Sequence, residues 1–231
     1  MKQIKIIFFD IDGTLIDMNK KKISEKVLEA LIRLKENGIK ICVATGRPPI
    51  QVPRFPNVEF DVFLTYNASY CFDKDQDIFS NPLKREDVYT IINNAGKIGR
   101  PLSLATKTRL VSNGTDQDLS DYYEISGQKV KIADDFDAVA DGEEIYQIML
   151  GCRKGEYDAV MKDVKEAKIA AWWDQAMAFG DGNNDIEMLK MVGRGVAMGN
   201  ASMELKAAAD DVCGDVAEDG IYSYLNACGL I

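Results

Sequence analysis

Two aspartates separated by one residue, Asp10 and Asp12, directly follow the apolar run Ile6–Phe9. The run predicts a buried strand, and Gly13 predicts the turn that ends it. Because side chains alternate along a strand, both carboxylates leave the strand end on the same side, where they repel each other unless a cation lies between them. The pair therefore predicts a divalent-cation site; the alternative is a turn that uses Asp as a capping residue.

A second acidic cluster, Asp181 and Asp185, follows another apolar run, 176–179, and precedes a predicted helix over 186–192. Gly182 lets the backbone approach a ligand closely. On its own the cluster is also what a helix N-terminus uses for capping. Together with Asp10 and Asp12 it supplies four carboxylates at strand ends, which are the ligands that Mg²⁺ prefers.

Thr45, Gly46 and Arg47 follow a third apolar run, 39–44. A hydroxyl, an unobstructed backbone and a positive charge at a strand end suit a phosphate group. An ordinary strand-to-loop turn explains the Thr-Gly pair equally well.

Composition excludes several functional classes. The chain of 231 residues contains no histidine, which rules out Ser-His-Asp and Cys-His catalysis and ordinary zinc sites. The net charge of −9 argues against nucleic acid or a membrane surface as a partner, and no apolar run approaches the roughly 18 residues of a membrane span. The five cysteines form no C-x-x-C pair, and no leader precedes the first strand, so we expect reduced thiols in a cytoplasmic protein.

The spacing of elements predicts an α/β fold. A helix after Ser24 that ends at Gly38 joins the first strand to the strand at 39–44, and this βαβ unit requires parallel strands. Asn81-Pro82 marks a boundary, after which strands and helices alternate in a smaller α+β pattern. We expect a three-layer αβα core with a parallel sheet over 1–81 and 174–231, and an inserted α/β cap over 82–173.

One junction does not fit this fold. Residues 168–173 and 176–179 both have the pattern of strands, yet only Asp174 and Gln175 separate them. A parallel core strand needs a crossover of about a dozen residues or more before it. We therefore expect a segment to be missing between Trp173 and Asp174.

The motifs resemble those of the haloacid dehalogenase-like superfamily, in its Cof-type sugar-phosphatase branch. The resemblance covers the whole chain and is carried by Asp10-Ile11-Asp12-Gly13-Thr14, Ala44-Thr45-Gly46-Arg47, Gly180-Asp181-Gly182-Asn183-Asn184-Asp185, Gly195-Val196-Ala197-Met198-Gly199-Asn200-Ala201 and, more loosely, Asn67-Ala68-Ser69.

The resemblance implies a Mg²⁺-dependent phosphatase with an αβα core and a cap that contacts the substrate. Asp10 would be the nucleophile, giving an aspartyl-phosphate, and Asp12 the proton carrier. The remaining implied roles are metal binding by Asp10, Asp12 (backbone carbonyl), Asp181, Gly182 and Asp185, phosphate binding by Ile11 (backbone), Thr45, Gly46 and Asn184, and substrate contact by Arg47 and Asn67.

The chain departs from the family at one motif. Family members carry a lysine soon after the cap, at the start of a core helix, where it offsets the charge of phosphate and nucleophile. Here that helix would fall at the junction before residue 174. Lys162, Lys165 and Lys168 are nearby but have the pattern of cap-helix surface residues, so we assign none of them this role.

Other functions share parts of this pattern. A phosphotransferase or phosphomutase would use the same intermediate, and a response-regulator receiver domain gathers similar residues but is shorter and has no cap. A true dehalogenase needs neither Asp12 nor the metal, and a non-catalytic relic becomes serious if no lysine exists near residue 174. We expect a small phosphorylated metabolite as the substrate, and a monomer or weak homo-oligomer.

Overall fold

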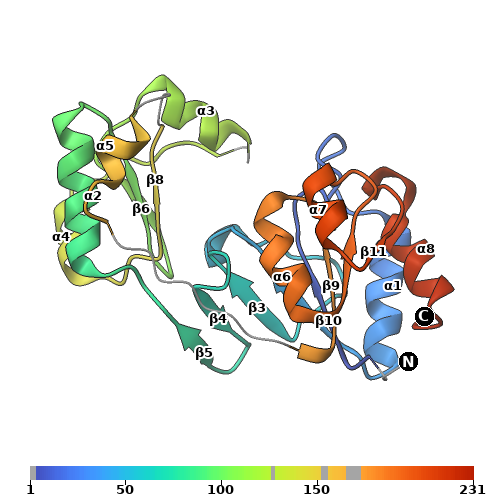
Figure 1. Ribbon diagram of the computed structural model, residues 1–231. Coiled ribbons are helices and arrows are strands. Elements are labelled where there is room, and N and C mark those ends of the chain that lie inside the picture. The colour runs from blue at the N-terminus through green and yellow to red at the C-terminus, as the bar shows by residue number, and fades with distance from the viewer. Residues whose placement is uncertain (1–3, 126–127, 152–155, 165–172) are drawn as a thin grey trace. The chain divides into compact units, whose positions relative to one another are not determined.

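The computed structural model describes residues 4–125, 128–151, 156–164 and 173–231. The chain divides into two compact units (Figure 1). The first comprises residues 1–46, 53–79 and 169–231, and the second comprises 47–52 and 80–168. Among the described residues, no helix is both long enough and apolar enough to cross a membrane.

The first unit is built on an eight-stranded sheet. Its order is β11-β10-β9-β1-β2-β3-β4-β5, and the pairs from β11 to β3 are parallel, whereas β3 and β4 are antiparallel. This confirms the predicted α/β fold with a parallel core sheet. The strands are β1 (Ile6–Phe9), β2 (Lys40–Ala44), β3 (Val62–Thr65), β4 (Tyr70–Phe72), β5 (Asp77–Ser80), β9 (Trp173–Gly180), β10 (Val192–Ala197) and β11 (Asp211–Val212).

β1 lies between β2 and β9, so the two acidic motifs end adjacent strands. Phe9 pairs with Val43 of β2 on one side and with Phe179 of β9 on the other. The rings of Phe9 and Phe179 stack with centroids 5.4 Å apart, and Tyr224 of α8 (Gly220–Ala227) meets Phe179 edge-on at 5.7 Å. This aromatic contact fixes the alignment of β1 and β9 just before their acidic ends.

Helices cover the sheet on both sides. α1 (Glu25–Glu36) begins where the Ser24 hydroxyl accepts a hydrogen bond from the Val27 N–H at 3.1 Å, and it ends before Gly38, whose φ is +75°. Figure 1 shows α6 (Ile186–Met191) on the opposite side of the sheet from α1 and α8. α7 (Met203–Ala208) begins at Ser202 in the same way as α1, with a 3.1 Å bond from the Leu205 N–H.

β9 runs without interruption through Trp173 and Asp174, the two residues between which we expect a missing segment. The predicted strand over 168–173 lies outside the described residues except for its last residue. No break in β9 therefore marks the junction.

The second unit is an α+β arrangement with its own core. Its sheet has the order β7-β6-β8, with both pairs antiparallel, and its largest fully buried side chains include Leu102, Leu104 and Leu119. The elements are α2 (Arg85–Lys97), β6 (Ser103–Ala105), β7 (Leu110–Ser112), α3 (Gln117–Ile125), α4 (Phe136–Gly142), β8 (Gln147–Met149) and α5 (Tyr157–Met161).

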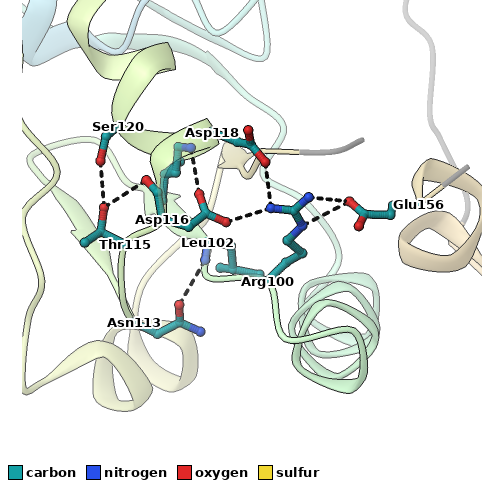
Figure 2. Close-up of polar contacts among 9 residues, drawn as sticks. Arg100, Leu102, Asn113, Thr115, Asp116, Asp118, Ser120 and Glu156 are labelled. Carbon is teal, nitrogen blue, oxygen red and sulfur yellow. Dashed lines mark hydrogen bonds and ion pairs between the residues drawn. The ribbon is translucent and has the colours of Figure 1, made fainter. Parts of the chain in front are cut away.

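Arg100 joins three segments of this second unit (Figure 2). Its guanidinium group donates to Asp116 at 2.9 Å, to Asp118 at 2.7 Å and to Glu156 at 2.8 Å. The arginine side chain is only 9% exposed. Removal of the Arg100 guanidinium group would leave three carboxylates facing one another, so Arg100 is a structural residue of this unit.

Candidate active site

Asp10 lies at the carboxyl end of β1, against β9. Its N–H donates to the Phe179 carbonyl at 3.2 Å, which continues the pairing of the two strands by one residue. The chain then turns tightly, with Gly13 at φ +83° and the Ile16 N–H donating to the Ile11 carbonyl at 2.8 Å. This turn leaves Asp10 5% exposed and Asp12 half-buried.

Three carboxylates converge at this point. One oxygen each from Asp10, Asp181 and Asp185 lies within 4.8 Å of the others. Asp181 follows β9 directly, and Asp185 begins α6, so the three side chains come from two neighbouring strand ends and one helix start. The predicted contribution of Asp12, a backbone carbonyl, stays a prediction.

Asp181 is oriented by groups from two other loops. The Thr14 hydroxyl donates to Asp181 Oδ1 at 3.2 Å, and Asn200 Nδ2 lies 3.5 Å from Asp181 Oδ2. Asn200 also donates to the Gly13 carbonyl at 2.9 Å and accepts from the Val216 N–H at 3.1 Å. The amide of Asn200 therefore connects the turn after β1, the carboxylate after β9 and the loop after β11.

Asp185 is held by the loop that precedes it. Its Oδ2 accepts from the N–H groups of Asp181 and Gly182, both at 3.1 Å. Its Oδ1 accepts from Asn184 Nδ2 at 3.0 Å. With both oxygens already hydrogen-bonded, Asp185 is better suited to support a cation through Asp181 or a water molecule than to be its main ligand.

Burial makes negative charge costly here. Burial, followed by the charges of Asp185 and Asp181, raises the pKa of Asp10 well above its ordinary value. Burial also raises the pKa of Asp181, and it raises the pKa of Asp185 to about 6. Carboxylate oxygens from two buried residues and one half-buried residue, whose repulsion a cation would relieve, are the ligand set of a hard divalent ion, so the residues fit Mg²⁺.

The predicted phosphate side lies at the same sheet edge. Because Phe9 pairs with Val43, Thr45 follows β2 beside the residue after Asp10. Thr45 is buried, and its carbonyl accepts from the Asn67 N–H at 3.0 Å, which joins this strand end to the β3–β4 turn. A Cβ at Gly46 would lie 3.1 Å from Asn67 Oδ1, so the fold places the Asn67 side chain against the loop of Thr45 and Gly46.

Arg47 and Asn184 were expected to contact substrate and phosphate, but their described contacts are with other groups of the protein. Arg47 groups with the second unit, where its Nη1 donates to the Gln51 carbonyl at 2.9 Å. The Asn184 side chain is directed to Asp185, as described above. Their predicted contacts to substrate and phosphate stay predictions.

The sequence pattern did not predict a role for Thr14 or Asn200, which contact Asp181, and it predicted only a turn at Gly13, which Asp181 approaches closely. Gly13 and Thr14 belong to the first motif, so their proximity to Asp10 was available as a signal. Asn200 lies 19 positions beyond Asp181 in the chain, and only the fold brings it to the site.

Comparison with known proteins confirms the resemblance. A family model described as haloacid dehalogenase-like hydrolase matches residues 7–174 and 169–225. YkrA of Bacillus subtilis (strain 168) is 30% identical over 257 aligned positions that cover 98% of each chain. The 5-amino-6-(5-phospho-D-ribitylamino)uracil phosphatase YbjI of Escherichia coli (strain K12) is 24% identical, with 96% and 95% covered. The solved structure of the HAD subclass IIB sugar phosphatase BT4131 matches with a TM-score of 0.82 and 27% identity, over 98% of this chain and 100% of that chain.

Proposed function

Because the chain belongs to the haloacid dehalogenase-like hydrolase family, we propose that it is a Mg²⁺-dependent phosphatase that hydrolyses a small phosphorylated metabolite through an aspartyl-phosphate. The observation that carries the proposal is the convergence of Asp10, Asp181 and Asp185 within 4.8 Å at the sheet edge. Bound there, Mg²⁺ would offset the negative charge shared by the carboxylates and the phosphate.

Asp10 is the nucleophile in this proposal. A carboxylate oxygen of Asp10 forms a bond to phosphorus while the bond from phosphorus to the ester oxygen breaks. The leaving oxygen takes a proton from Asp12. Asp12 then accepts a proton from a water molecule that attacks phosphorus, which releases inorganic phosphate and restores the Asp10 carboxylate.

The loops around Asp10 hold the phosphoryl group. The Ile11 backbone N–H, Thr45, Gly46 and Asn184 would donate to its oxygens. Asn67 and Arg47 would contact the rest of the substrate. The short distance between Gly46 and the Asn67 side chain supports this division, because an amide beside the Thr-Gly loop is within reach of a group attached to the phosphate.

The substrate class is proposed from the relatives. One is named a sugar phosphatase, and another a phosphatase of a phosphorylated ribitylamino-uracil. We propose that this chain also acts on a sugar or polyol phosphate. The free cysteines Cys42, Cys71, Cys213 and Cys228 support a reducing, cytoplasmic setting.

The test is turnover of a panel of sugar and polyol phosphates with Mg²⁺ by Asp10→Asn and Asp12→Asn variants. Asp10→Asn should abolish phosphate release, and Asp12→Asn should reduce it while the fold persists. Asp137→Asn, an exposed aspartate of α4, is the matched control and should leave the rate unchanged. Full activity of Asp10→Asn, or turnover that continues in EDTA, would contradict the proposal. Label transferred to a sugar acceptor instead of water would favour a phosphotransferase.

A further inference from the structure

The chain is shorter than its relatives at an internal position. The alignment with the Bacillus subtilis relative has 257 positions and covers 98% of both proteins, whereas this chain has 231 residues. At least 26 positions of the alignment, the difference between these two lengths, therefore have no counterpart here. Since nearly all of both chains is aligned, the shortfall is internal.

The family match places this shortfall. It falls into two pieces, residues 7–174 and 169–225, which meet at 169–174. This is the entry to β9, the strand that carries Asp181. A match that divides here points to additional chain in the Bacillus subtilis relative immediately before one of the two strands that build the site.

The topology shows what such a segment does. β9 is parallel to β1, and a parallel neighbour is reached through a crossover of about a dozen residues or more, usually a helix. α5, the last described helix before β9, belongs to the second unit: Val160 is buried in that core with Val88 and Ile91, and Asn94 Nδ2 donates to the Val160 carbonyl at 3.1 Å. Only residues 162–172 remain between α5 and β9.

The charge of the site shows what else the segment could supply. Within the part of the chain that the structure describes, the groups that donate hydrogen bonds to Asp181 and Asp185 are a hydroxyl, amides and backbone N–H groups. The sequence contains no lysine or arginine from 169 to 189, on either side of these aspartates. A phosphate dianion that approaches three carboxylates needs more positive charge than one divalent ion provides.

We propose that the chain has lost, just before β9, the crossover of at least 26 residues that its relatives carry, together with a basic side chain that balances the phosphate at Asp10. The chain then binds the divalent cation but transfers the phosphoryl group slowly. This inference rests on the proposed function of the same site.

The first experiment uses the chain as it is. Its kcat/KM for p-nitrophenyl phosphate is measured with Mg²⁺ while ethylammonium replaces sodium at constant ionic strength. An ammonium group that takes the position proposed for the lost basic side chain should accelerate turnover in a saturable way. Tetramethylammonium carries the same charge but cannot donate a hydrogen bond, and it should have no effect. Equal responses to the two ions would overturn the proposal.

The second experiment restores the segment. The additional residues of the Bacillus subtilis relative are inserted immediately before Trp173, the first residue of β9, and a twin insertion has every lysine and arginine replaced by glutamine. The insertion should raise kcat/KM by about 100-fold. The twin should stay near the starting rate, and Mn²⁺ binding, followed by electron paramagnetic resonance, should be the same in all three proteins. A starting chain as fast as its insertion variant would overturn the proposal.

Two controls separate the possible failures. Replacing Lys162, Lys165 and Lys168 by glutamine should leave the slow turnover unchanged; a large loss would show that one of them already supplies the charge, which overturns the proposal. This variant and the ethylammonium experiment decide the question if the insertion does not fold. Asp10→Asn in the insertion variant tests the proposed function itself, because activity that survives there contradicts the nucleophile and not the lost crossover.

Discussion

Gly13 and Asp181 approach so closely that a Cβ atom on Gly13 would lie 2.2 Å from Asp181 Oδ2. Gly13 also has φ +83°, in the left-handed region that favours glycine. The turn after β1 therefore does two things at once. It redirects the chain after Asp10, and it leaves the space that the carboxylate from β9 occupies.

Gly13→Ala should abolish cation binding and phosphatase activity, because the methyl group displaces Asp181. Gly38→Ala is the matched control: Gly38 has a similar φ of +75°, but a Cβ there meets nothing within 4 Å. The control should lose about 1 kcal/mol of stability and keep its Mn²⁺ affinity. Calorimetric titration with Mn²⁺ and thermal unfolding of both variants measure this, and equal affinities would refute the prediction.

Asn200→Ala should weaken Mg²⁺ binding about tenfold, since Asp181 loses a donor and the turn at Gly13 loses its link to the loop after β11. The Mg²⁺ affinity of Asn200→Ser, which keeps a hydrogen-bond donor, should lie between those of the unaltered protein and Asn200→Ala. Asn37 also donates from Nδ2 to a distant carbonyl, that of Leu230 at 2.8 Å. Asn37 ends α1 and precedes β2, so it lies toward the opposite edge of the parallel sheet from Asp10, which follows β1. Asn37→Ala should change stability and not affinity; a matching loss of affinity would assign both effects to the fold alone.

The metal-free protein should become less stable as pH rises from about 5 to 7. Burial raises the pKa of Asp185 to about 6 from an ordinary value of 3.8, and it also raises those of Asp10 and Asp181. The folded protein thus holds protons that the unfolded chain has released, and their contribution is lost as pH passes the folded pKa values.

Mg²⁺ should oppose this loss, because it takes the place of the protons. The Tm measured in EDTA should fall across this range, the Tm with Mg²⁺ should fall less, and Asp185→Asn should flatten the EDTA curve. A Tm in EDTA that rises from pH 5 to 7 would show that these carboxyls are not protonated in the folded protein.

Ala68→Gly should stabilise the protein by about 0.5–1 kcal/mol. Tyr66, Asn67 and Ala68 all have positive φ values, of 53°, 53° and 67°, and the alanine gains no local side-chain hydrogen bond in return. Ala207→Gly, at an exposed position in α7, is the opposite case and should cost about 1 kcal/mol. Urea unfolding measures the free energy of unfolding of both variants. A loss of stability in Ala68→Gly as well as in Ala207→Gly would mean that the turn at Ala68 is not strained.

The sequence alone was enough for the parts of the site that follow from strand patterning. Apolar runs that end in acids located Asp10, Asp181 and Asp185, and the βαβ spacing implied that the strand before Asp10 is parallel to the strand over 39–44. The ends of α1 were also predictable, since Ser24 and Gly38 are strong local signals.

Elements with weak local signals were missed. β4 has three residues, and α4 (Phe136–Gly142) lies in a segment rich in Asp, a residue with low helix propensity. β8 is equally short, because it is confined to Gln147–Met149, the three residues that pair with β6. Asn200 could not be predicted because its role depends only on contacts between distant parts of the chain.

The position of β1 also has a consequence for how the protein is made. β1 leaves the ribosome well before its neighbour β9, because the whole second unit lies between them in the sequence, and Thr14 and Asp181 are 167 positions apart. Until β9 emerges, one edge of β1 has no strand to pair with, and such edges recruit other chains. The second unit has its own core and is complete by then. Nascent chains released between residues 168 and 180 should therefore contain a folded second unit beside an aggregation-prone open sheet.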